Sequence, residues 1–388
     1  MKATGTYITT SAAGESFQAF VPDPLPPDPP LQLDQQARDL IEKANRALGR
    51  LDGITTLLPD VSLLLYFYVR KEAVLSSQIE GTQSSISDLL MHEESLAPGV
   101  PLDDVQEVSN YVAAMNHGLK RLREDNFPLS LRLIREMHKV LLSGGRGSDK
   151  TPGQFRRSQN WLGGARPGNA RFVPPPPDRV VECMGNLEKF LHDQPQCTGV
   201  LIKAALSHVQ FETIHPFLDG NGRLGRLLIT HILCAEGVLQ QPLLYLSLFF
   251  KQHRAEYYDR LDAVRLKGDW LGWLRFFLEG VDKTAWQAAD TATRILELFD
   301  EDRSRIETLG RKAASAHRLH ELLRRHPITT IPGGAKQLKL TAPTVRSAIA
   351  SLEDLGIVRE ITGKRRDRAY IYDRYMKILD EGTEPISA

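Results

Sequence analysis

The sequence predicts a mostly α-helical protein with one β-hairpin and a small α+β unit near its end. Apolar residues recur at helical spacing through most of residues 34–314, and Gly and Pro interrupt this pattern around 143–180. Residues 315–388 combine helical segments with two short strand patterns. We therefore expect a helical bundle with a hairpin over 34–314, a winged helix-turn-helix over 315–388 and an N-terminal arm over 1–33.

The elements are expected in the following order. The arm has some strand character, but the proline-rich run from Pro22 to Pro30 excludes helix, so we expect a tether on the surface. The apolar spacing then predicts helices from about 34, and over about 60–79, 84–92, 101–124 and 129–143. Further helices are expected at about 178–193, at 199–214, from Leu224, and from 270 to about 314.

A glycine-rich turn at residues 215–226, HPFLDGNGRLGR, precedes one of these helices. Gly220 and Gly222 allow the backbone to gather several N–H groups. Such a turn binds anions, because the free N–H groups and the helix dipole both favour negative charge. The turn therefore predicts a phosphate site at the start of the helix.

Charged side chains in the same stretch fit that site. Arg223 and Arg226 are unfavourable for the dipole at a helix start, and a bound polyphosphate would remove this conflict. Asp219 is suited to Mg²⁺, which takes one or two carboxylates plus phosphate oxygens, and His215 can titrate near neutral pH. The alternative is a turn that caps a core helix beside a structural histidine, but such a turn does not need two arginines and a histidine at fixed offsets.

Residues 215–226 match the core motif of the Fic family, HPFxDGNGRxxR, at every position, and the chain resembles that family. The resemblance implies an enzyme that transfers AMP from ATP to a Ser, Thr or Tyr hydroxyl of a target protein, with ATP and Mg²⁺ bound. It also implies a set of roles: His215 as general base, Asp219 as Mg²⁺ ligand, Gly220, Asn221 and Gly222 as phosphate cradle, and Arg223 and Arg226 as ligands of the outer phosphates.

A second short motif, Ser76–Gly81, precedes the core motif. By itself it indicates a helix end, with Gly81 as the stop and Glu80 disfavoured by the dipole. It also fits the Fic inhibitory signature, Ser/Thr-x-x-x-Glu-Gly/Asn. The resemblance implies that Glu80 pairs with Arg226 where the ATP γ-phosphate would bind, with Ser76 and Gly81 completing an inhibitory helix upstream of the core motif.

The predicted hairpin lies at about 159–174, and on its own it could be a plain surface hairpin. Fic proteins carry a flap before the core motif that holds the target as an added strand. The resemblance therefore implies target docking here, with Trp161 and Phe172 as candidate flap residues. It also places Tyr257 or Tyr258 near the adenine and makes a homodimer the expected assembly, whereas we expect His208 to be packed rather than catalytic.

The C-terminal unit is basic, with Lys and Arg exceeding Asp and Glu by six over 311–388 and an excess of five acids elsewhere. A recognition helix from about 342 would present Thr344, Arg346 and Ser347, and the loop at Lys364, Arg365 and Arg366 could contact phosphates, so DNA is a possible partner. The alternative is that this unit serves protein contact or dimerisation.

The motifs, the resemblance and the C-terminal unit leave three functions to weigh. The first is an AMP transferase inhibited by Glu80, the second an enzyme that removes AMP or transfers another phosphate group at the same site, and the third a nucleotide-sensing transcription regulator. No apolar run approaches the ~20 residues of a membrane helix. The three cysteines, Cys183, Cys197 and Cys234, have no metal-site spacing, so we expect a cytoplasmic protein.

Overall fold

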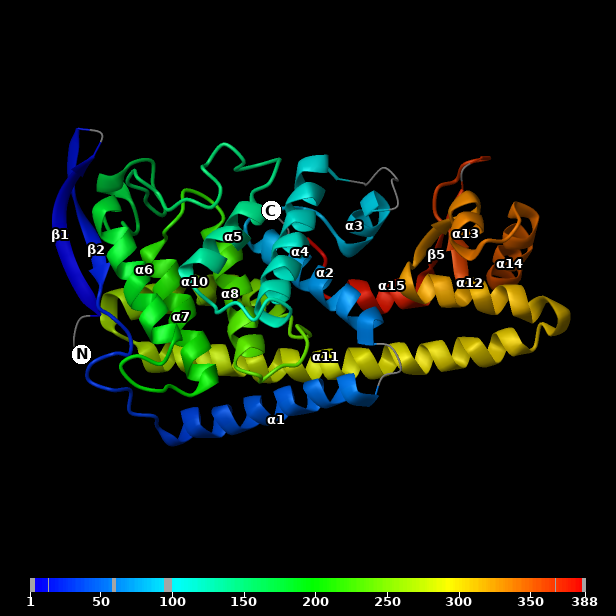
Figure 1. Ribbon diagram of the computed structural model, residues 1–388, viewed down its shortest axis with the longest axis horizontal. Coiled ribbons are helices and arrows are strands. Elements are labelled where there is room, and N and C mark those ends of the chain that lie inside the picture. The colour runs from blue at the N-terminus through cyan, green and yellow to red at the C-terminus, as the bar shows by residue number, and fades with distance from the viewer. Residues whose placement is uncertain (1–3, 13, 58–60, 94–99, 367, 386–388) are drawn as a thin grey trace.

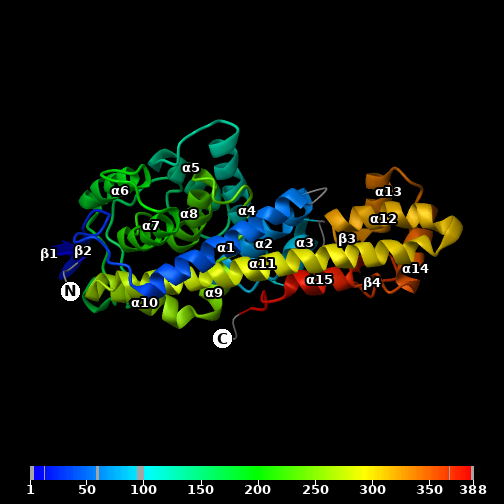
Figure 2. The ribbon, with the colours of Figure 1, turned by 90° about the horizontal axis from the view of Figure 1, so that it is seen from below.

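The computed structural model describes residues 4–12, 14–57, 61–93, 100–366 and 368–385. A long helix, α11 (Trp270–Glu307), runs along the molecule, and α1 (Gln35–Leu57) lies beside it (Figures 1 and 2). Both helices bury alanines, with Ala44 on α1 and Ala288 on α11 fully enclosed. Small side chains let the two helix axes approach closely. The other elements are arranged along this pair of helices.

The predicted helical body is confirmed. Its remaining helices are α2 (Val61–Ile79), α3 (Ile86–Glu93), α4 (Leu102–Arg123), α5 (Leu131–Leu141), α6 (Pro177–Leu191), α7 (Val200–Ile214), α8 (Asn221–Ala235), α9 (Ser247–Gln252) and α10 (Arg254–Lys267). α7 packs against α8 and is also covered by α6, α10 and α11, so nearly all its residues are buried. A helix that is enclosed on all sides is a rigid support, and both helices that flank residues 215–220 are of this kind. Among the described residues, no helix combines the length and apolar character that a membrane crossing requires.

The N-terminal arm differs from the expected surface tether. β1 (Gly5–Ala12) and β2 (Glu15–Pro22) pair as an antiparallel hairpin in register Thr6 to Val21. β2 buries Phe17 and Phe20 against the body, and the Phe20 N–H donates to the carbonyl of Val173. An isolated two-stranded hairpin is marginal in water, and this burial supplies the stability that sequence reasoning had not assigned to the arm.

The hairpin predicted at 159–174 is much smaller than expected. One antiparallel bridge joins Leu162 and Phe172, whose N–H groups each donate to the other residue's carbonyl at 2.8 and 3.1 Å. A 3₁₀ turn, η1 (Pro167–Asn169), occupies the connection, and its proline has no N–H to donate to a ladder. The predicted hairpin is therefore present only as a loop that one antiparallel bridge closes.

The C-terminal unit consists of short helices around a small sheet. After the turn η2 (Gly310–Lys312) follow α12 (Ala313–Arg325), β3 (Ile328–Thr330), α13 (Ile331–Leu338), α14 (Ala342–Asp354), β4 (Val358–Glu360), β5 (Ala369–Tyr372) and α15 (Asp373–Asp380). The antiparallel sheet has the order β3-β5-β4. α11 ends before residue 314, its predicted end. Neither β3 nor α15 was predicted. The elements follow the expected order, while the winged helix-turn-helix type and its boundaries stay predictions.

Candidate active site

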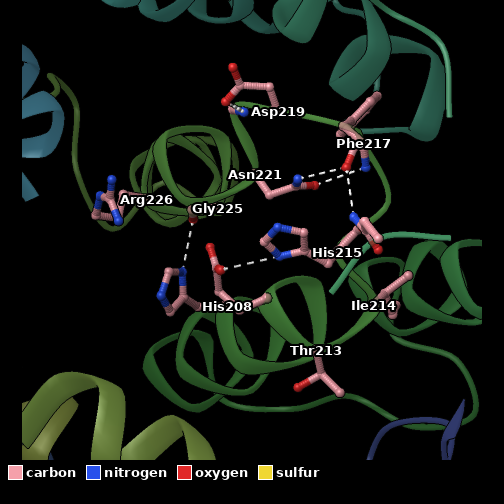
Figure 3. A network of polar contacts seen from close by, with 12 residues as sticks. His208, Thr213, Ile214, His215, Phe217, Asp219, Asn221, Gly225 and Arg226 are labelled. Atoms are coloured by element: carbon pink, nitrogen blue, oxygen red, sulfur yellow. Dashed lines mark hydrogen bonds and ion pairs between the residues drawn. The ribbon is translucent and has the colours of Figure 1, made fainter. Parts of the chain in front are cut away.

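His215 and Gly220 bound the loop that joins α7 to α8. His215 takes the left-handed conformation, with φ 48°, so the chain leaves the axis of α7 at this residue, and Gly220 caps α8 with φ 74°. Figure 3 shows His215, Asp219 and Arg226 around the first turns of α8. These three side chains and Arg223 line one cavity of about 560 Å³. The structure thus brings together the charged residues of the core motif.

Asn221 fixes this loop rather than facing the cavity with its amide. Its Oδ1 accepts from the Phe217 N–H and its Nδ2 donates to the Phe217 carbonyl, each at 2.9 Å (Figure 3). Any contribution of Asn221 to a phosphate cradle must therefore come from its backbone. The N–H groups of a first helical turn have no intrahelical partner, so the cradle at the start of α8 is made of main chain.

Two supports of the loop were missed by sequence reasoning. The Nδ1 of His138 accepts from the Gly153 N–H at 2.8 Å, so its Nε2 donates to the Asp219 carbonyl at 3.0 Å. Its ring stacks on Phe217, with centroids 3.7 Å apart. The buried guanidinium of Arg156 donates to the carbonyl of His215 at 2.9 Å and to that of Pro175. Neither residue lies within a recognisable motif, so only the fold reveals their roles.

Arg226 is the charged centre of the site and pairs with Glu80 as predicted. Its Nη2 lies 2.6 Å from the Glu80 carboxylate, its Nε donates to the Ser76 hydroxyl at 2.8 Å, and its Nη2 also donates to the Ser76 carbonyl. Gly81 ends the turn after α2 with φ 106°. Burial opposes the ionisation of Glu80, but Arg226 prevails and lowers the pKa of the carboxyl. The Ser76–Gly81 segment thus places an anion on Arg226.

The absence of a side chain at Gly222 leaves space for the Glu80 carboxylate. A Cβ built at position 222 would lie 2.2 Å from the Glu80 Oε1, closer than any real contact allows. The first turn of α8 therefore accommodates either the Glu80 carboxylate or another anion in the same place. A larger residue at 222 would force the Glu80 carboxylate to shift from this place.

Arg223 faces a second set of carboxylates. It pairs with Glu107 of α4 at 3.0 Å and lies 3.5 Å from Asp219. Burial raises the pKa of Glu107, and Arg223 offsets part of that effect. Glu107 was not predicted, because its position in α4 carries no sequence signal. The Asp219 Oδ1 also accepts from the Gly220 N–H at 2.6 Å.

His215 is held neutral by its surroundings. Burial, followed by the charges of Arg265 and Arg156, lowers its pKa to about 3. A neutral imidazole has one nitrogen free to accept a proton. Its Nδ1 lies 4.0 Å from the carboxylate of Glu212, so Nε2 is the nitrogen available to a group in the cavity.

The tyrosines at 257 and 258 both line the cavity. The hydroxyl of Tyr257 is already hydrogen-bonded to His208. The Nδ1 of His208 donates to the Gly225 carbonyl at 3.0 Å, so its Nε2 accepts from the Tyr257 hydroxyl at 2.8 Å. His208 is buried and structural, as expected. Tyr258 is only partly buried, so its ring is the more accessible of the two.

A segment after α15 packs onto the turn that carries Glu80. The Nε2 of Gln78, a buried side chain, donates to the carbonyls of Ser84 and Thr383 at 2.8 and 2.7 Å. Lys251 donates to the carbonyl of Gly382 at 3.1 Å. The Glu80 turn is thus held in place by residues distant in sequence.

The donor set suits a metal ion that arrives with phosphates. Among the described residues, no group of three or more His, Cys, Asp or Glu side chains could hold a metal ion alone. Asp219 lines the cavity with one carboxylate, and Mg²⁺ commonly takes one or two carboxylates and completes its shell with phosphate oxygens and water. The residues present fit a magnesium–nucleotide complex rather than a resident metal.

Two family models match the chain: Fic/DOC family N-terminal over residues 38–120 and Fic/DOC family over residues 128–233. Over 255 residues the chain is 29% identical to the protein adenylyltransferase Fic of Aedes aegypti. The matched region covers 65% of this chain and 47% of that protein. The chain therefore spans about half the length of the curated relatives it matches.

The fold is also shared with solved structures. A Fic family protein from Desulfovibrio desulfuricans G20 matches 88% of this chain and 97% of its own, with a TM-score of 0.59 at 18% identity. Residues 134–508 of Fic-1 from C. elegans match 67% of this chain and 74% of theirs, with a TM-score of 0.50 at 25% identity. The first likeness, at its low identity, concerns the fold alone.

Proposed function

The chain belongs to the Fic/DOC family, and we propose that it is a protein adenylyltransferase that moves AMP from ATP to a hydroxyl of a target protein. The observation that carries the proposal is a cavity of about 560 Å³ at the start of α8, which His215, Asp219, Arg223 and Arg226 line together. Attack on a nucleotide phosphate requires a base and groups that bind the phosphate charge. This cavity offers a base, a carboxylate and two guanidinium groups around a helix start.

The chemical step has a simple balance. The target hydroxyl oxygen forms a bond to the α-phosphorus, the bond from that phosphorus to the oxygen bridging to the β-phosphate breaks, and pyrophosphate leaves. The hydroxyl proton passes to the Nε2 of His215, which can accept it when the neutral ring carries its own proton on Nδ1. Free N–H groups of α8, with Arg223 and Arg226, hold the phosphates. Mg²⁺ bound at Asp219 would neutralise phosphate charge when the nucleotide is present.

The Glu80 carboxylate would inhibit this reaction. It contacts Arg226 at 2.6 Å and occupies space beside Gly222, where an outer phosphate would otherwise lie. Two anions cannot share one guanidinium at this distance without strong repulsion. We therefore place control of the enzyme in the Ser76–Gly81 segment.

The target would dock on the loop around 159–174. The bridge from Leu162 to Phe172 places a short extended segment at the cavity, which both residues line. An extended peptide could add its main-chain hydrogen bonds here. With one bridge as the platform, the docked stretch would be only a few residues long.

A second role, DNA binding by the C-terminal unit, is favoured by its exposed basic loop. Lys364, Arg365 and Arg366 are exposed, and so are Arg346 and Ser347 on α14. We propose that this surface contacts phosphates, with affinity that falls as salt rises. A gel shift at low salt tests it: charge reversal of Lys364 and Arg365 should abolish the shift, and no shift with the native protein at low salt would refute it.

Mass spectrometry of proteins incubated with ATP and Mg²⁺ tests the main proposal. A protein mass increase equal to one adenylyl group, which is AMP less one water, is expected with Glu80→Gly and is expected to disappear in the double variant Glu80→Gly, His215→Ala. Adducts that survive the loss of His215 would refute the mechanism. Release of AMP from a modified target by the native protein would instead favour hydrolytic removal of AMP at the same site.

A further inference from the structure

Glu212 is a buried carboxylate beneath the proposed base that the mechanism above does not use. It lies on α7, three residues before His215, and is only 6% exposed. Its Oε2 is 4.0 Å from the Nδ1 of His215. Among the described residues, that Nδ1 and the Glu212 Oε1 are both buried without a hydrogen-bond partner.

The Glu212 carboxylate faces the unpaired Nδ1 of His215 through its Oε2, and this points to a hydrogen bond that closes when the site is filled. An unsatisfied buried polar atom is unfavourable, so the pair gains by a shift of about 1 Å toward bonding distance. Catalytic hydrogen bonds are often long without substrate and tighten once it binds. Glu212 lies on the last turn of α7 and His215 caps that helix, so the two side chains are already adjacent.

The neighbouring helix leaves a space for this carboxylate. A Cβ built on Gly225 of α8 would lie 2.5 Å from the Glu212 Oε1. A side chain at 225 would therefore displace the carboxylate. Gly225 is one of the variable positions of the core motif, so the motif alone gave no reason for a glycine here.

We propose that Glu212 is a positioning residue that accepts the Nδ1–H of His215 and so keeps the Nε2 lone pair directed into the cavity. This inference rests on the proposed function, because it assigns His215 as base. The two nitrogens of a neutral imidazole are distinct, and the bond made by one decides where the proton sits on the other. With Nδ1–H held by Glu212, Nε2 is an acceptor.

The charges around Glu212 make this support sensitive to pH. Arg226 and Arg265 face it from α8 and α10, Glu80 faces it from the turn after α2, and the hydroxyls of Tyr257 and Tyr258 on α10 are also near. Burial raises the pKa of Glu212 to about 7, an effect that Arg226 opposes and Glu80 reinforces.

The direction of the pH effect follows from the proton count. Above about pH 7 the Glu212 carboxylate is ionised and accepts from Nδ1–H, so Nε2 is free. Below it, the protonated acid donates to Nδ1 and the ring proton moves to Nε2, which then cannot act as base. Because the pKa of His215 is lowered to about 3, the imidazole stays neutral near pH 7. The fall in kcat below about pH 7, the acid limb of the pH profile, therefore reflects protonation of Glu212.

Kinetics of two substitutions in the Glu80→Gly background test this. Glu212→Leu should lower kcat about tenfold or more, with the KM for ATP changed by less than about twofold. Glu212→Gln keeps a carbonyl acceptor for Nδ1–H, so it should keep far more activity but lose the fall in kcat below about pH 7. Glu236→Gln, at the other end of α8 and paired with Lys203, is the matched control and should match the parent. A kcat of Glu212→Leu within about twofold of the parent, or an unchanged acid limb in Glu212→Gln, would overturn the proposal.

Nitrogen chemical shifts of ¹⁵N-labelled histidine give a reading that does not depend on AMP transfer. His215 in the native protein should carry its proton on Nδ1 at about pH 8 and on Nε2 at about pH 6, and Glu212→Leu should remove the transition. Comparison with His215→Ala assigns the signal. A proton on Nε2 at the higher pH would refute the pairing even if the enzyme proved inactive, so failure of the proposed function and failure of this inference remain distinguishable.

Discussion

Replacement of Glu80 by glycine removes the ion pair that opposes nucleotide binding at Arg226. In the native chain an incoming γ-phosphate must displace a carboxylate that lies 2.6 Å from the guanidinium. Arg226 is buried, but the Glu80 side chain is 34% exposed. We therefore take the value for a charged hydrogen bond, about 1.5–3 kcal/mol, rather than the larger cost of breaking a fully buried pair.

That energy sets the size of the expected effect. Each 1.4 kcal/mol is about a tenfold change in an equilibrium constant, so Glu80→Gly should raise the rate of AMP transfer at limiting ATP by about tenfold to hundredfold. Arg226 keeps its bonds to Ser76, so the free energy of unfolding should fall by less than the binding gain.

The assay compares rates at ATP concentrations well below KM, with Glu93→Gly as the matched control. Glu93 also pairs with an arginine, Arg70, at 2.7 Å, but it does not line the active-site cavity. The control should leave the rate within about twofold of the native protein. An equal rise in both variants, or no rise in Glu80→Gly, would refute the competition between Glu80 and phosphate.

Three further predictions concern the supports of the site. Arg156→Ala should lower the free energy of unfolding by about 3 kcal/mol or more, because it leaves buried carbonyls without donors; urea titration measures this, and a change below about 1 kcal/mol would contradict it. Gln78→Ala should raise AMP transfer severalfold in the native chain but not in Glu80→Gly, because it frees only the turn that carries Glu80; an equal effect in both backgrounds would argue against that turn as its route. Burial lowers the pKa of His138 and His231 to about 4, so their contribution to stability is complete above the unfolded value of about 6.5 and is lost as pH falls from there toward 4; urea midpoints at about pH 7.5 and about pH 5 test this, and equal midpoints would contradict it.

The parts of the site that could be predicted from sequence are those in contiguous motifs. A glycine-rich turn before a helix fixes its own geometry, so residues 215–226 and their relation to an anion followed from local chemistry. The partner of Arg226 came from the family's short signature at 76–81. These local patterns translate directly into a loop and a helix start.

The supports could not be predicted, because they depend on which distant elements meet. Glu107, His138 and Arg156 reach the loop from separate helices or loops, and ordinary helical spacing hides their roles. Glu212 looks like one more residue of a buried helix until the left-handed turn of His215 places the imidazole against it. The N-terminal hairpin was underestimated for the same reason, since Phe17 and Phe20 gain their stability from the body.

The position of the transferred phosphorus tests the central claim most directly. Glu80→Gly should be incubated in parallel with ATP labelled in the α-phosphate and with ATP labelled in the γ-phosphate. We predict protein-bound label from the α-labelled nucleotide only, with its loss in Glu80→Gly, His215→Ala. Label from the γ-labelled nucleotide would show that the cavity performs a different phosphate transfer and would contradict the account.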